Sequence, residues 1–127
     1  MKFTLHDLEK RVRSRAKKRG KVGAEPSYTR KLLDRGVAQC AKKLGEEAVE
    51  TVLAAVNESR SRLIAETADL IYHLLVVLEA RGVTLAQVEA ALAKRTRQSG
   101  LEEKASRRVD ARKRKSRVRR ARGRKRN

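Results

Sequence analysis

The sequence is poor in residues that interrupt helices and in residues that build aromatic binding surfaces. Its 127 residues include one proline, seven glycines and three aromatic side chains. So few turn formers argue against a many-stranded fold, and so few rings exclude a protein built on aromatic stacking platforms. The single cysteine, Cys40, has no partner for an internal disulfide, and the N-terminus lacks the apolar run of a signal peptide. We therefore expect a cytoplasmic protein with a reduced thiol.

Helix-forming residues dominate the composition, because alanine, leucine, glutamate, lysine and arginine are its common residues. Apolar residues recur at helical spacing, and Thr4, Ser27 and Thr84 stand where helix N-caps are expected. The expected helices span about 5–19, 28–35, 37–56, 61–81 and 85–95, with a loop at 20–26. The sequence thus predicts an all-α bundle of about five helices joined by short connections.

Positive charge is concentrated at the two ends of the chain. The net charge of +19 divides into +6 for residues 1–26, zero for 27–103 and +13 for 104–127. The last segment has almost no apolar side chains, so it cannot bury enough surface to offset the entropy lost on ordering. We therefore expect a helical domain over 1–103 and a disordered basic tail over 104–127.

Three glutamates follow one another at helical spacing in the third expected helix. Glu46, Glu47 and Glu50 fall on one arc beside the apolar face of that helix. Like charges three or four residues apart destabilise a helix by a few tenths of a kcal/mol, a cost that is common on surfaces. Alone, the motif is equally well explained as a solvated face.

The fourth expected helix is apolar on nearly all sides, which predicts that its neighbours bury it. Even so, Glu66, Asp69 and His73 lie on one narrow arc of it. Buried carboxylates must be paired, protonated or bound to a cation. If the two helices face each other, their four carboxylates surround one point, and oxygen-only ligands suit Mg²⁺ or Mn²⁺. The alternative is neutralisation by Lys42, Lys43 or an arginine from another segment.

Three segments carry a resemblance to a known family. They read S-Y-T-R-K-L-L at 27–33, K-L-G-E-E-A-V-E at 43–50 and E-T-A-D-L-I-Y-H-L-L at 66–75. Together they resemble the phosphoribosyl-ATP pyrophosphatases of histidine biosynthesis, over roughly residues 3–100. The two acidic motifs alone are shared with the wider MazG-like group of all-α nucleoside triphosphate pyrophosphohydrolases.

The resemblance implies Mg²⁺-dependent hydrolysis of phosphoribosyl-ATP to phosphoribosyl-AMP and diphosphate by a homodimer that completes the helical core. By motif position, the metal ligands would be Glu47, Glu50, Glu66 and Asp69. Glu46 would bind a further metal or orient the attacking water, and either Glu46 or Glu50 would take or steer its proton.

Other residues of the matched segments are candidates for substrate binding. Lys31 and Lys43 would hold outer phosphates or the ribose phosphate, and Tyr28 would either stack on the adenine or make a local packing contact. Two rival functions remain open at this point. One is a general house-cleaning nucleoside triphosphate pyrophosphohydrolase. The other is a non-enzymatic helical protein whose basic tail binds nucleic acid by counterion release, without reading sequence.

Overall fold

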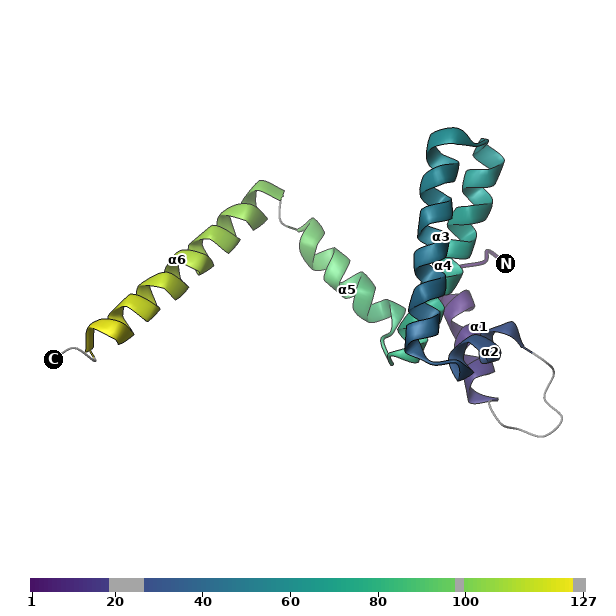
Figure 1. Cartoon of the computed structure of the whole chain (residues 1–127), viewed down its shortest axis with the longest axis horizontal. Helices are drawn as coiled ribbons and strands as arrows, with labels where there is room; N and C mark the ends of the chain where they lie inside the picture. Colours follow the sequence, from purple (N-terminus) through teal and green to yellow (C-terminus); the bar gives the residue numbers. More distant parts are fainter. Residues whose placement is uncertain (19–26, 98–99, 125–127) are drawn as a thin grey trace. The chain divides into compact units, whose positions relative to one another are not determined.

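The computed structural model describes residues 1–18, 27–97 and 100–124, and every regular element within these ranges is an α-helix. The predicted all-α class is confirmed, whereas the loop expected at 20–26 lies outside the described residues. The chain divides into two compact units, residues 1–87 and 88–127, which are described separately. The helices are α1 (Leu5–Lys17), α2 (Tyr28–Asp34), α3 (Val37–Asn57), α4 (Arg60–Ala80), α5 (Leu85–Thr96) and α6 (Gly100–Arg124) (Figure 1).

The helix starts that the sequence predicts are present. Thr4 and Asp7 form a reciprocal capping box at α1, in which the Asp7 N–H donates to Thr4 Oγ1 at 3.3 Å. Ser27 caps α2 by accepting from the Arg30 N–H. The Gln87 N–H donates to Thr84 Oγ1 at 3.2 Å at the start of α5. These caps satisfy backbone donors that would otherwise lack partners, which is why they fix helix starts from sequence.

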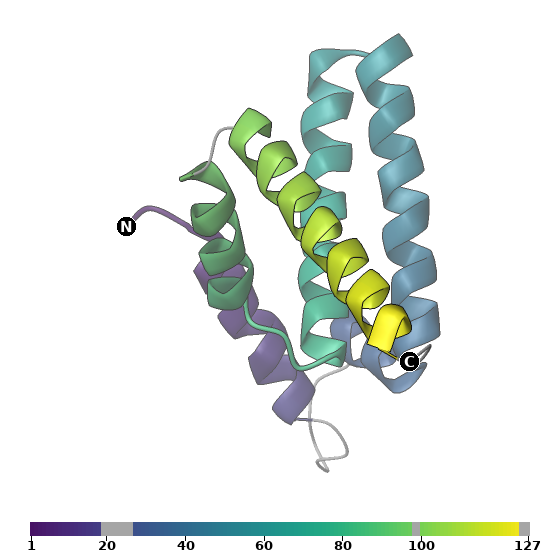
Figure 2. The same ribbon diagram turned by 90° about the vertical axis from the view of Figure 1, so that its left-hand side faces the viewer.

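The two longest helices of the first unit form a hairpin that positions the acidic residues. Figures 1 and 2 both show α3 and α4 side by side along their length. The Thr51 hydroxyl ties them together, since it lies 2.8 Å from the Glu47 carbonyl oxygen and 3.1 Å from the Glu66 carbonyl oxygen. The acidic motifs of the two helices therefore lie at the same level of the hairpin.

A small core joins the first four helices. Val12, Leu32, Cys40 and Val76 are at most 2% exposed, and each comes from a different helix. The Cys40 thiol donates to the Leu32 carbonyl oxygen at 3.2 Å, so it is packed as a small side chain, and burial raises its pKa. This core fixes the N-terminal end of α3 against the C-terminal half of α4.

The prediction that α4 is buried on nearly all sides is wrong for the single chain. Ile64 is 63% exposed and Leu74 is 39% exposed. Packing against α3 covers one side of α4, and the short helices α1 and α2 cover only part of the remainder. On α3, a row of exposed apolar side chains follows helical spacing: Val49, Val52, Leu53 and Val56.

The C-terminal segment differs from the disordered tail that the sequence predicts. The structure has a helix from Gly100 to Arg124, although its described side chains are almost all exposed. The segment buries almost nothing, as expected, but local propensity favours a helix here, because arginine, lysine and alanine are good helix formers. Glu103 also pairs with Arg107 one turn later, which adds support. The domain boundary at residue 103 stays a prediction.

Candidate metal and phosphate site

Carboxylate oxygens from α3 and α4 converge on one point of the hairpin. One oxygen from each of Glu47, Glu66 and Asp69 lies within 4.8 Å of the other two. Glu47 and Glu66 are buried, with 8% and 4% exposure, while Asp69 is exposed. The helical spacing of the two motifs and the alignment of the hairpin bring these three predicted ligands together.

Glu50 lies near these carboxylates on the exposed side of α3, although it is not one of the three whose oxygens converge within 4.8 Å. Burial raises the pKa of Glu47, and the negative charge of Glu50 raises it further. Burial is also the main cause of the raised pKa of Glu66, and a hydrogen bond with Glu50 adds to it. The charge of Asp69 also raises the pKa of both buried carboxyl groups, so Glu50 and Asp69 each act on Glu47 and on Glu66.

Two basic side chains compensate part of this charge. Arg62 lies one turn before Glu66 on α4 and forms an ion pair with it. The positive charge of Arg62 lowers the pKa of Glu66, whereas burial raises it. Lys43 Nζ lies 3.6 Å from Glu47 Oε1. Among the described residues, no basic side chain forms an ion pair with Asp69. Neutralisation by protein cations, the alternative left open by the sequence, is therefore present but incomplete.

The structure places Glu46 outside the group of converging carboxylates. Its Oε2 accepts a hydrogen bond from Lys43 Nζ at 2.9 Å, and Lys42 Nζ lies 3.9 Å from its other oxygen. The hydrogen bond from Lys43 lowers the pKa of Glu46 and raises the pKa of Lys43. Glu46 thus holds Lys43 beside the site, and its role toward a water molecule stays a prediction.

Two rings of α4, those of Tyr72 and His73, lie in the neighbouring part of the hairpin. His73 Nε2 lies 3.7 Å from Glu47 Oε1, and burial lowers the pKa of His73, which favours the neutral imidazole. Its Nδ1 is buried without a hydrogen-bond partner among the described residues. Tyr72 lies edge-on to His73 at 5.0 Å between ring centroids. No role is predicted for Tyr72 from the sequence, although its place directly before His73 in the acidic motif of α4 could have indicated one.

The candidate substrate residues lie on two helices. Tyr28 is 54% exposed and stacks on Tyr72 with ring centroids 6.4 Å apart, so the packing contact that the sequence allowed is present. Lys43 lies at the acidic group, as described above. Lys31 is exposed on α2, and it forms no ion pair with any residue in the described ranges. The structure does not join Lys31 to the acidic group by any contact.

Comparisons with known proteins show which family the sequence matches. Residues 5–96 match the family model described as phosphoribosyl-ATP pyrophosphohydrolase. The chain is 63% identical over 106 residues to phosphoribosyl-ATP pyrophosphatase 1 of Bradyrhizobium diazoefficiens, covering 84% of this chain and 96% of that protein. It is 61% identical over 109 residues to the protein of the same name from Rhodopseudomonas palustris, covering 86% of this chain and 98% of that one. The chain belongs to the phosphoribosyl-ATP pyrophosphohydrolase family.

Membership of the phosphoribosyl-ATP pyrophosphohydrolase family makes this chain a hydrolase and confirms the resemblance drawn from its motifs. The matched residues include the acidic group and its surroundings, but the match ends at residue 96, before α6 begins. Within the described ranges, none of the helices combines the length and the apolar character needed to cross a bilayer.

Proposed function

We propose that this chain hydrolyses the α–β phosphoanhydride bond of phosphoribosyl-ATP, giving phosphoribosyl-AMP and diphosphate in the second step of histidine biosynthesis. The names of the relatives support the substrate, because the two described above are phosphoribosyl-ATP pyrophosphatases. The observation that carries the proposal is the convergence of Glu47, Glu66 and Asp69 on one point of a chain from this family. An acidic point of this kind suits the capture of a polyphosphate through a divalent cation.

The chemistry of the acidic group fits Mg²⁺, with Mn²⁺ as a substitute. All the ligand atoms on offer are carboxylate oxygens, which hard divalent cations prefer. Arg62 and Lys43 balance only part of the charge of four carboxylates. Glu47, Glu50, Glu66 and Asp69 would hold the ion. When bound, it would neutralise charge on the phosphate oxygens and on the departing diphosphate.

The chain's own residues have the remaining tasks. Glu50, exposed beside the buried carboxylates, would take or steer the proton of a water molecule, with Glu46 as the other candidate base. Lys43 is held at the site by Glu46 and would contact an outer phosphate. Lys31 and Tyr28 would contact the ribose phosphate and the adenine from α2.

The exposed apolar faces support a homodimer. Val49, Val52, Leu53 and Val56 form one row on α3, each more than half exposed. Apolar rows of this kind rarely face water in a stable monomer. We propose that a second copy of the chain covers them, and light scattering coupled to size exclusion would measure the resulting mass.

Replacement of the carboxylates tests the site. With phosphoribosyl-ATP and Mg²⁺, the variants E50A and D69A should each lose activity by on the order of 10³-fold, since they remove charge where the phosphates react. The exposed Glu89 on α5 gives the matched control, and E89A should keep its activity. Circular dichroism should show unchanged helix content in all three. Activity retained by D69A would reject the site.

Substrate choice is tested separately with the unaltered protein. Turnover of phosphoribosyl-ATP should exceed turnover of free ATP and other nucleoside triphosphates under the same conditions. A preference for ordinary triphosphates would favour the house-cleaning alternative while leaving the acidic site intact.

A further inference from the structure

Helix α6 carries a continuous row of positive charge on one side. At 100° per residue, six basic positions fall within an arc of about 80°. They are Lys104, Arg108, Arg112, Lys115, Arg119 and Arg122, here called the basic stripe. All six side chains are exposed. At 1.5 Å per residue the basic stripe is about 27 Å long.

In the part of the chain that the structure describes, the basic stripe has no paired counter-charge. Among the described residues, none of its six side chains forms an ion pair with a carboxylate. Asp110 lies on the opposite side of α6 by helical spacing, and Glu103 pairs with Arg107, which is outside the stripe. Neighbours within the stripe are three or four residues apart, where like charges repel. A polyanion lying along the stripe would relieve this repulsion.

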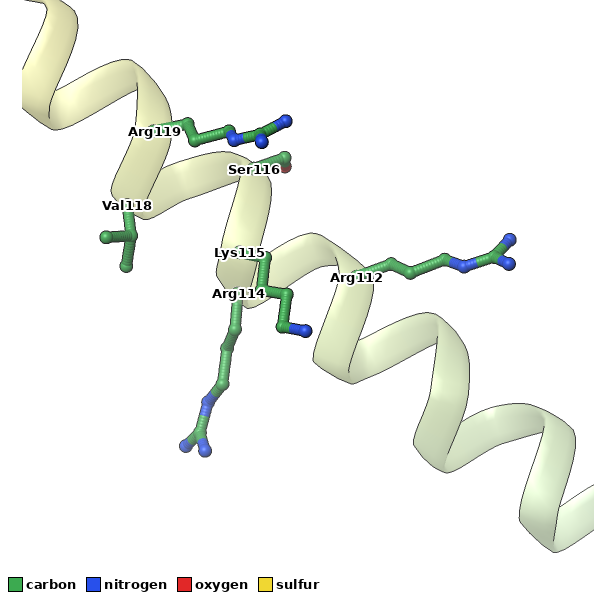
Figure 3. A pocket seen from close by; sticks show the side chains of 6 residues that line it. All are labelled: Arg112, Arg114, Lys115, Ser116, Val118 and Arg119. Atoms are coloured by element: carbon green, nitrogen blue, oxygen red, sulfur yellow. The ribbon is translucent and has the colours of Figure 1, made fainter.

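The geometry of α6 argues against a small ligand and against a membrane. A hollow beside the helix is lined by Arg112, Arg114, Lys115, Ser116, Val118 and Arg119. Figure 3 shows that Arg112 and Arg119 extend to one side of the helix while Arg114 and Val118 extend to another, so they do not enclose a molecule. Val109 and Val118 lie on opposite sides by helical spacing, so α6 has no apolar face to insert into lipid.

The composition of α6 also decides how a polyanion would be recognised. The segment from Gly100 to Arg124 has no aromatic side chain, so it cannot stack on unpaired bases. Its basic side chains follow one another at intervals of about 4.5–6 Å along the helix axis, so several of them can contact phosphates of one nucleic-acid backbone. We propose that α6 binds double-stranded nucleic acid through the phosphates of its backbone, without reading base sequence.

This activity would be separate from hydrolysis. The family match ends at residue 96. The alignment with the Bradyrhizobium protein covers 96% of that protein and 84% of this chain. The basic stripe therefore lies outside the part that defines the family. Variants of α6 can report on nucleic-acid binding without touching the acidic group.

The first measurement uses the full-length protein and fluorescently labelled 20-base-pair DNA and RNA duplexes, read by anisotropy. Six phosphate contacts predict that affinity falls about 10³-fold between 50 and 200 mM salt. DNA and RNA duplexes should bind comparably, because both present phosphates. Tighter binding to a 20-nucleotide single strand, or to phosphatidylserine vesicles, would overturn the proposal, as would no binding to either duplex at 50 mM salt.

A matched pair of triple variants tests the stripe itself. One variant, R112Q/K115Q/R119Q, removes three charges from the basic stripe. The other, K113Q/R117Q/R120Q, removes three charges from the opposite side of α6, so the two have equal net charge. The stripe variant should reduce the slope of log affinity against log salt by about 2.7, and the control should change it much less. Hydrolysis of phosphoribosyl-ATP should be unchanged in both. Equal losses of binding would show that net charge alone acts, and would overturn the assignment to the stripe.

Discussion

The α3–α4 hairpin and helix α6 both concentrate charge of one sign, but in different geometries. In the hairpin, two packed helices turn oxygens of Glu47, Glu66 and Asp69 to within 4.8 Å of one another. In α6, a single helix spaces its basic side chains along its length, and these side chains stay exposed. In the hairpin, carboxylates of two helices meet at one point, whereas the basic side chains of α6 follow one another in a line.

The difference in geometry sets the size of the ligand that each region suits. Carboxylates that raise one another's pKa at a point are relieved by one small divalent cation. Guanidinium and ammonium groups spread over several helical turns are relieved by a polymer whose charges are also spread. The amount of charge does not decide between a small cation and a polymer as the ligand. The packing around the charged side chains decides it, because packing sets whether they meet at a point or lie in a row.

The largest expected effect comes from removing one region and keeping the other. A chain ended after Glu103 should lose duplex binding by on the order of 10³-fold at 50 mM salt, because it lacks every residue of the basic stripe. Its hydrolysis of phosphoribosyl-ATP should match that of the full-length protein, since the family match ends at residue 96. Anisotropy and a diphosphate-release assay check the two halves of this prediction. Loss of hydrolysis would show that the two regions depend on each other.

The helix starts and the acidic face of each helix could be predicted because they depend on local rules. The Thr4 capping box and the Ser27 cap are set by neighbouring residues, and helical spacing alone puts Glu66 and Asp69 on one side of α4. The pairing of Glu46 with Lys42 and Lys43 could not be predicted. On a helical wheel Glu46 lies beside Glu50, and spacing alone does not say which of the two contacts the lysines of its own helix.

Two other features escaped sequence reasoning for opposite reasons. The contact of Thr29 Oγ1 with the Tyr72 hydroxyl at 2.6 Å joins residues far apart in the chain, so no local sequence pattern predicts it. The helix over Gly100–Arg124 cannot be predicted from burial, because the segment packs against almost nothing. Its residues favour a helix locally, even though the segment buries almost nothing.

Metal binding should stabilise the hairpin and leave α6 unaffected. Mg²⁺ at about 100 times its dissociation constant should add about 2.7 kcal/mol to the free energy of unfolding, seen as a rise in Tm that EDTA reverses. D69A should show no rise, because it removes a ligand. The stripe variant R112Q/K115Q/R119Q should show the same rise as the unaltered protein. A rise that persists in D69A would place the ion elsewhere.

The smallest expected effect is a change in the free energy of unfolding. It is measured by making the same substitution, valine to alanine, once in the core of the first unit and once on α6. Val76 is fully buried in the core and Val118 is 54% exposed on α6. V76A removes two methyl groups from contact with Val12, Leu32 and Cys40, which should cost about 2 kcal/mol from lost burial and the cavity left behind. V118A should change the free energy of unfolding by less than about 0.5 kcal/mol, because the side chain is already in water. Urea unfolding at one protein concentration measures both. A cost for V118A as large as that for V76A would mean that α6 is packed against a surface, and a surface that covers α6 would compete with nucleic acid for it.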